Sequence, residues 1–140
     1  MSISRREQIM QAIVATLDSA LRIPVHRAPE IPIDTADAIV CVVDWESEGV
    51  EVLTWQADDC QLIVRMTIMA RATNDWWLRA DEALITAHSA LMSDQTLGGL
   101  AMTIRRRRAS SRTDDYEQTV CTILHSYEVQ YRHNSNDLTT

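Results

Sequence analysis

The side chains best suited to nucleophilic chemistry are Cys121 and His125, which stand four positions apart near the end of the chain. A cysteine is activated when a histidine within hydrogen-bonding distance takes its proton. Apolar and polar residues alternate around the two, which indicates a strand, so both side chains point to the same face. Four residues of strand separate them by about 13 Å. We therefore expect no catalytic cysteine–histidine pair.

Metal and cofactor chemistry finds equally little support. The cysteines number three, lack a Cys-x-x-Cys motif and have apolar neighbours: Cys41, Cys60 and Cys121. Buried, reduced thiols are typical of cytosolic proteins. The four histidines are scattered without the spacing of zinc ligands, and three glycines form no phosphate-binding loop. We predict no enzyme activity, no metal and no cofactor.

The most unusual local feature is a run of four arginines: Arg105, Arg106, Arg107 and Arg108. On a strand, two of them point to each face. The run is either a solvated hairpin tip, a cluster that faces carboxylates of a neighbouring subunit, or a local phosphate-binding patch. Loop carboxylates that could serve in a subunit contact are Asp58, Asp59, Asp114 and Asp115. We therefore predict these eight residues as candidates for a subunit or partner interface.

Composition restricts the possible partners. The chain has 140 residues, of which 46% are hydrophobic, and this is the size of one ordinary domain. The net charge of −7 argues against general affinity for nucleic acid or for an anionic membrane surface. All 13 basic residues are arginine, which forms fixed, bidentate contacts with carboxylates. No apolar run is long enough to span a membrane, and the N-terminus lacks the apolar stretch of a secretory signal.

Two amphipathic helices are expected. Ser4 and Glu7 fit a capping box at the start of a helix over 5–21, and Pro24 limits its continuation. A second helix is expected over 75–92, with a cap supplied by 73–75. Its core face repeats at helical spacing and contains Trp77, Ala80, Leu84, Ala87 and Leu91. Trp76 is then partly exposed or covered by the first helix.

The remaining sequence predicts strands. The longest is 119–132, and 38–46, 50–55, 60–71 and 100–108 are expected to pair with it or with one another. Turns are expected at 47–49 and 56–59, and a polar loop at 109–115. The proline-containing crossover 23–37 holds a possible short strand at 25–27. We predict one α+β domain over 1–140, with a mostly antiparallel sheet, both helices on one face and a flexible tail at 133–140.

The order of these elements carries a family resemblance. The first helix has the pattern Arg-x-x-x-Ile-x-x-Ala-Ile-x-x-x-Leu, and a proline-containing link and a hydrophobic strand at 38–43 follow it. The second helix carries Trp77, Asp81 and His88, and the chain closes on an arginine-rich strand, an acidic loop and a Tyr-x-Val-x-Tyr ending at 127–131. In this order the chain resembles the tail terminator, or tail completion, proteins of tailed bacteriophages, the group that includes the minor tail protein U type.

The resemblance implies a structural role in the virion. Terminator proteins form a ring, commonly a hexamer, on the head-proximal end of the tail tube, where they end tube polymerisation and provide the joint to the head connector. The implied partners are other copies of the chain, the tail tube protein and the head–tail connector protein, while DNA only passes through the lumen. The implied location is the virion tail, after assembly in the host cytoplasm.

A second hypothesis remains open from the residues alone. The chain could be a different virion adaptor or tube protein, or a small non-enzymatic oligomeric binding module. A closed ring or a cap on tube ends favours the terminator, whereas a stable dimer that never joins tubes favours the alternative.

Overall fold

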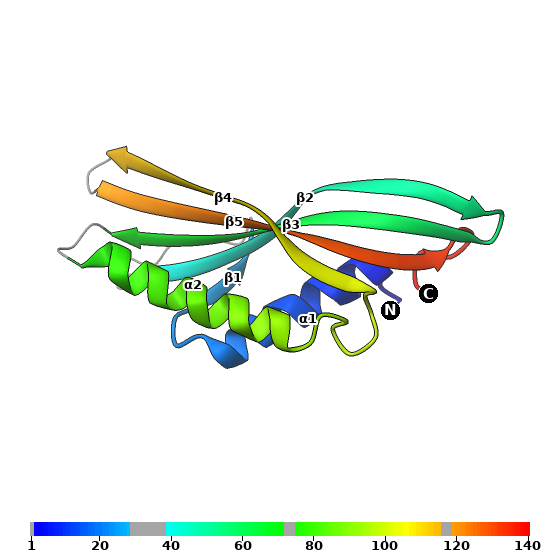
Figure 1. Ribbon diagram of the computed structural model, residues 1–140, viewed down its shortest axis with the longest axis horizontal. Coiled ribbons are helices and arrows are strands. Elements are labelled where there is room, and N and C mark those ends of the chain that lie inside the picture. The colour runs from blue at the N-terminus through cyan, green and yellow to red at the C-terminus, as the bar shows by residue number, and fades with distance from the viewer. Residues whose placement is uncertain (1, 29–38, 72–74, 116–118) are drawn as a thin grey trace.

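The computed structural model describes residues 2–28, 39–71, 75–115 and 119–140. For residues 114, 115 and 119 it describes the backbone alone. Its elements follow the order α1 (Arg5–Ala20), β1 (Val25–Arg27), β2 (Ile39–Thr54), β3 (Ala57–Arg71), α2 (Trp76–Ser93), β4 (Thr103–Asp115) and β5 (Thr119–Asn134). Figure 1 shows a long, twisted sheet with both helices beneath one face. The predicted α+β class is confirmed.

The sheet has the strand order β1-β2-β3-β5-β4. The three contacts among β2, β3, β5 and β4 are antiparallel, and short β1 joins the outer side of β2 in parallel at Cys41–Val43. β3 and β5 therefore form the centre, with β4 at one edge. The prediction that the long final strand pairs with the arginine-rich strand is confirmed.

The core lies between the sheet and the two helices. On β3 every second residue from Cys60 to Ala70 points into this core, and Ile63 is buried as well, on the other face. On β5 the core side chains include Tyr127, Val129 and Tyr131, all at most 3% exposed. Apolar side chains at helical spacing on the two helices cover these strand residues. The helix side chains are Ile9, Ile13 and Leu17 on α1 and Ala80, Leu84, Ala87 and Leu91 on α2. Burial of this apolar surface is what stabilises the layer arrangement.

The start of α1 follows the predicted cap in one of its two hydrogen bonds. The Ser4 hydroxyl accepts a hydrogen bond from the backbone N–H of Glu7 at 3.1 Å. The Glu7 carboxylate turns instead to Arg27 on β1, with Nη1 at 2.5 Å and Nη2 at 3.2 Å. The hydrogen bonds from Arg27 lower the pKa of Glu7 below its usual value. One side chain thus fastens the first strand to the first helix.

The predicted turn at 47–49 is wrong. β2 runs without interruption from Ile39 to Thr54, and its register against β3 shifts between Trp45 and Ser47. A bulge there absorbs one extra residue, so the strand bends without reversing. The chain reverses between Thr54 and Ala57, which pair with each other. The observed turn is therefore residues 55–56, and only its second residue belongs to the predicted turn at 56–59.

The prediction of a polar loop at 109–115 is also wrong, because β4 continues to Asp115. Its partners there are residues of β5 from Thr119 to His125. Cross-strand hydrogen bonding to a long neighbour keeps serines and threonines in a strand although their composition is typical of a loop. The suggested start of the final strand at Tyr116 lies outside the described residues.

The core position predicted for Trp77 is wrong, whereas Trp76 is partly exposed, as predicted. Trp77 is 52% exposed, while Trp76 is partly buried and packs against the core. Both are about equally far, in helical angle, from the buried stripe of α2, on opposite flanks. The flank of Trp76 is the one that carries Ala83, which lines a groove with Leu21 at the end of α1. Trp76 and Ala83, which share this flank, both pack against the core.

The last residues of the chain make defined contacts. Asn134 forms a bridge with Asp137, and the carbonyl of Leu138 accepts a hydrogen bond from the N–H of Arg5 at 2.6 Å. The side chain of Gln8 donates to the carbonyl of Thr139 at 3.1 Å. The two termini lie together at one end of the molecule (Figure 1). That the tail at 133–140 is flexible stays a prediction, since these contacts do not measure motion.

Candidate assembly surface

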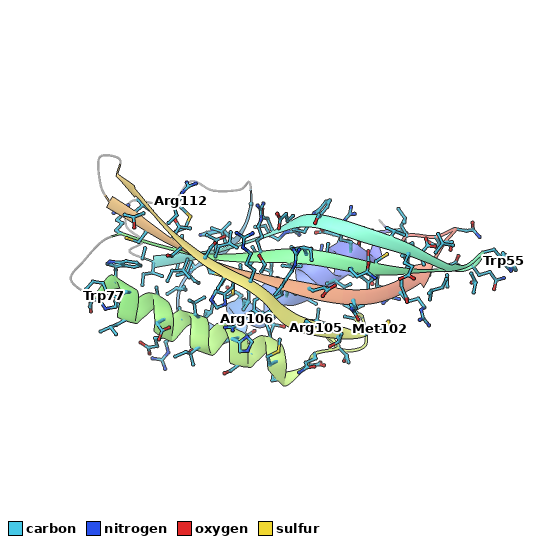
Figure 2. The ribbon with its side chains drawn as sticks, turned by 45° about the horizontal axis from the view of Figure 1, so that its top comes forward. Trp55, Trp77, Met102, Arg105, Arg106 and Arg112 are labelled. Carbon is cyan, nitrogen blue, oxygen red and sulfur yellow. The ribbon has the colours of Figure 1, made fainter. Side chains whose placement is uncertain are left out.

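The four consecutive arginines lie on β4, the edge strand of the sheet. Arg105 pairs with Glu128, Arg106 with Tyr127 and Arg108 with Ser126, and a bulge takes up Arg107. Paired residues share a face, so Arg105 and Arg108 point away from the helices and Arg106 points to the helix side. All four are exposed. Figure 2 shows Arg105 and Arg106 along the first half of β4.

These arginines differ from the other arginines in their partners. Four of the others form ion pairs within the chain, which are Arg6–Glu48, Arg27–Glu7, Arg65–Asp44 and Arg132–Asp59. Among the described residues, no carboxylate lies within ion-pair distance of Arg105–Arg108, although Glu128 stands opposite Arg105 in the register. Their charges are directed to solvent and are available to another molecule.

The carboxylates predicted to serve a subunit contact lie elsewhere. Asp58 and Asp59 begin β3 beside the end of β5, where Asp59 binds Arg132 at 2.8 Å and Asp58 accepts a hydrogen bond from Ser135 at 3.0 Å. Asp114 and Asp115 end β4, opposite Val120 and Thr119. The described contacts thus place the eight predicted residues at three separate places along the sheet. Their part in an interface stays a prediction.

The sequence patterns did not single out the most exposed apolar surface. At the end of the β2–β3 hairpin, four apolar side chains are 43–77% exposed, namely Val50, Val52, Leu53 and Trp55. We call this set the hairpin end. Figure 1 shows the hairpin extending past the helices, and Figure 2 shows Trp55 at its tip. The poor alternation over 50–55, with apolar residues on both faces beside a charged turn, was the available signal.

A cluster of aromatic and titratable side chains lies between α2 and β5. Nδ1 of His88 is 3.0 Å from the Tyr127 hydroxyl, and the two rings stack at 5.9 Å between centroids. His125 lies 6.5 Å from Tyr127, and its buried Nδ1 has no hydrogen-bond partner among the described residues. Burial lowers the pKa of His125, and the nearby positive charge of Arg106 lowers it further. Burial raises the pKa of Tyr127 to about 12.

The thiols show the environment expected of structural cysteines. Cys41, Cys60 and Cys121 are free and buried. Burial raises the pKa of Cys41 to about 12, so its reactive thiolate form is scarce at neutral pH. In the part of the chain that the structure describes, no three or more histidine, cysteine, aspartate or glutamate side chains gather as a metal site would require. No helix within the described ranges combines the length and apolar character needed to cross a membrane.

Comparisons with known proteins give likenesses among solved structures and none among sequences. No family model matches the sequence, and no curated protein matches it. The fold is similar to a chain described as the sheath/tube terminator, in the extended state, of PVC, an extracellular contractile injection system. The likeness has a TM-score of 0.44 and 13% sequence identity, and it covers 96% of this chain and 59% of the other. This chain therefore spans about three fifths of that protein's length, and at this TM-score the likeness carries no weight for function.

Proposed function

We propose that this protein is a virion structural component that forms a ring on the head-proximal end of a phage tail tube. In that position it ends tube polymerisation and provides the joint to the head connector. The proposal rests on the sequence resemblance, and the observation that carries it is the exposed hairpin end. Its four apolar side chains project from one end of a narrow molecule, where a ring would present them to the next component of the tail.

The chemistry of the hairpin end fits a protein partner. Clusters of exposed apolar residues mark protein–protein contacts, and tryptophan is prominent among residues that dominate binding energy. Trp55 is 77% exposed and Val52 is 72% exposed. The tube protein and the connector protein are the proposed partners of the ring, while DNA passes through its lumen. The role requires no covalent chemistry and no cofactor.

The test uses tubes grown from the tube protein that the same genome encodes. Tubes polymerised with this chain present are expected to stop growing and to carry a ring at one end in negative-stain images. The variant Val52→Thr with Trp55→Gln is expected to lose the cap, and Leu138→Gln, which removes a 65% exposed apolar side chain elsewhere, serves as its control. Tubes of unchanged length with bare ends would contradict the proposal and favour a different adaptor or binding module.

A further inference from the structure

The sheet has two open edges among the described residues. β4 is the last strand on one side. On the other side β1 pairs only with Cys41–Val43, so β2 from Asp44 to Thr54 has no described strand beside it. We call residues 44–54 the distal β2 edge. Open edges present unpaired backbone N–H and C=O groups, which makes them templates for pairing with another chain.

The two edges carry opposite charge. β4 presents Arg105–Arg108, which have no ion pair within the described chain. The distal β2 edge carries Glu46 and Glu51, both exposed and also without an ion pair among described residues. The register places Glu51 on the face away from the helices, as it pairs with Asp59 and thereby with Arg132. Arg105 and Arg108 point to that same face.

Strand direction and length also match. Every step from β2 through β3 and β5 to β4 is antiparallel, so β4 runs opposite to β2. A second copy that is merely rotated, not inverted, therefore brings its β2 antiparallel to β4 of the first. The 13 residues of β4 and the 11 of the distal β2 edge extend over roughly 43 Å and 36 Å. At the same height along the strands, the registers set residues 103–108 level with residues 44–49, and backbone groups of two neighbouring copies can pair over this stretch.

From these edges we infer that β4 of one copy binds the distal β2 edge of the next copy, in a contact between sheets that continues around a ring. The inference rests on the proposed function, because it specifies the contact that builds the proposed ring. Pairing of two β4 edges would set arginine beside arginine, and pairing of two distal β2 edges would set glutamate beside glutamate, so both two-fold dimers are disfavoured. The unlike edges attract, and a repeated unlike contact closes into a ring.

The contact is tested by reversing the charges. The basic-edge variant carries Arg105→Glu and Arg108→Glu, and the acidic-edge variant carries Glu46→Arg and Glu51→Arg. On the face away from the helices, the substituted positions of each variant then carry the same sign of charge as the opposite, unchanged edge. We expect each alone to associate at least about tenfold more weakly than the native chain, as measured by light scattering. The variant that carries all four changes has complementary edges again and is expected to regain the ring.

A mixture gives an independent test. On the face away from the helices, the substituted positions and the opposite edge are both negative in the basic-edge variant and both positive in the acidic-edge variant. An equimolar mixture is therefore expected to form rings in which the two variants alternate. Matched charge reversals on α2, Arg79→Glu and Glu82→Arg, are expected to leave assembly unchanged, and circular dichroism checks that every variant is folded. If the folded four-change variant and the mixture both stay monomeric, or if the native chain never associates, the inference is overturned and the arginines only protect an exposed edge.

The inference and the proposed function fail in distinguishable ways. Rings that obey the charge rules but leave tube growth unaffected retain the edge contact and contradict the terminator role. Capped tubes that are indifferent to charge reversal at both edges retain the terminator role and contradict the edge contact.

Discussion

Glu48 joins three parts of the protein at the level of a single side chain. Its carboxylate accepts a hydrogen bond from the Tyr131 hydroxyl of β5 and binds Nη1 of Arg6 on α1 at 3.2 Å. Arg6 in turn lies 4.2 Å from the centroid of the Trp45 ring. Burial and then the hydrogen bond to Glu48 raise the pKa of Tyr131, so the phenol stays protonated and keeps donating. Polar contacts of this kind fix how α1 sits on the sheet.

His125 makes stability depend on pH. Burial and the adjacent Arg106 lower its folded-state pKa below 6.5, so the unfolded chain binds the proton more readily. Stability is therefore complete above about pH 6.5 and falls as the pH decreases through that value toward the folded pKa. We expect urea unfolding of the native chain to show this loss between pH 7.5 and 5.5, with a slope of at most about 1.4 kcal/mol per pH unit from this residue.

The variant His125→Gln isolates this contribution, since glutamine does not titrate. Its free energy of unfolding is expected to fall less steeply than that of the native chain as the pH decreases. His26→Gln, on the short β1 strand, is the matched control for the replacement of a histidine by glutamine. Equal slopes for the native chain and His125→Gln would show that His125 is not held neutral by its surroundings.

Two factors decide which segments become helices or strands: the pattern of apolar residues along the segment, and the contacts that the segment makes with its neighbours. The alternation from Cys60 to Ala70 predicted β3, and its inward residues are all buried. Helical spacing predicted α1 and α2 to within about a turn. By contrast, Ser47–Gly49 has the composition of a turn but lies within β2, because β3 continues opposite it and supplies the hydrogen bonds. Such an outcome depends on a partner strand that local composition does not encode.

The candidate site shows the same limit. The arginine run was visible in the sequence, yet its place on an open edge follows only from the strand order. Glu46 and Glu51 were not singled out, because their relation to β4 exists only across the sheet and between copies. Asp58 and Asp59 looked like free loop carboxylates, whereas they start a strand whose neighbour supplies Arg132 and Ser135.

The unequal burial of the two tryptophans of α2 predicts unequal contributions to stability. We expect Trp76→Ala to lower the free energy of unfolding by about 2 kcal/mol, since it removes a partly buried ring from the core border. Trp77→Ala loses mainly the edge-to-face contact between the two rings, whose centroids are 5.9 Å apart, and is expected to cost about 0.5–1 kcal/mol. Chemical denaturation measures both values. A larger loss of unfolding free energy for Trp77→Ala than for Trp76→Ala would show that Trp77 packs on the core face.

At the scale of the whole molecule, charge is distributed unevenly. The chain carries a net charge of −7, yet one edge of its sheet gathers four arginines that form no ion pair with any described residue. Copies of such a molecule repel one another on average, and attraction is confined to orientations that bring β4 to the distal β2 edge. Local complementarity within overall repulsion favours one mode of association over others. It also makes that association sensitive to ionic strength.

We therefore expect the proposed ring to weaken as salt is added. The screening length falls from about 10 Å at 0.1 M salt to about 3 Å at 1 M, which reduces attraction between exposed edges. Light scattering over this range is expected to show a rising dissociation constant for the native chain. The four-change variant is expected to behave in the same way, because its two edges also carry opposite charges. A variant with Arg105, Arg108, Glu46 and Glu51 all replaced by Gln keeps the strands but loses these four charges, and its weaker association should respond less to salt. Association that strengthens with salt would instead assign the contact to apolar burial, for which the hairpin end offers the exposed side chains.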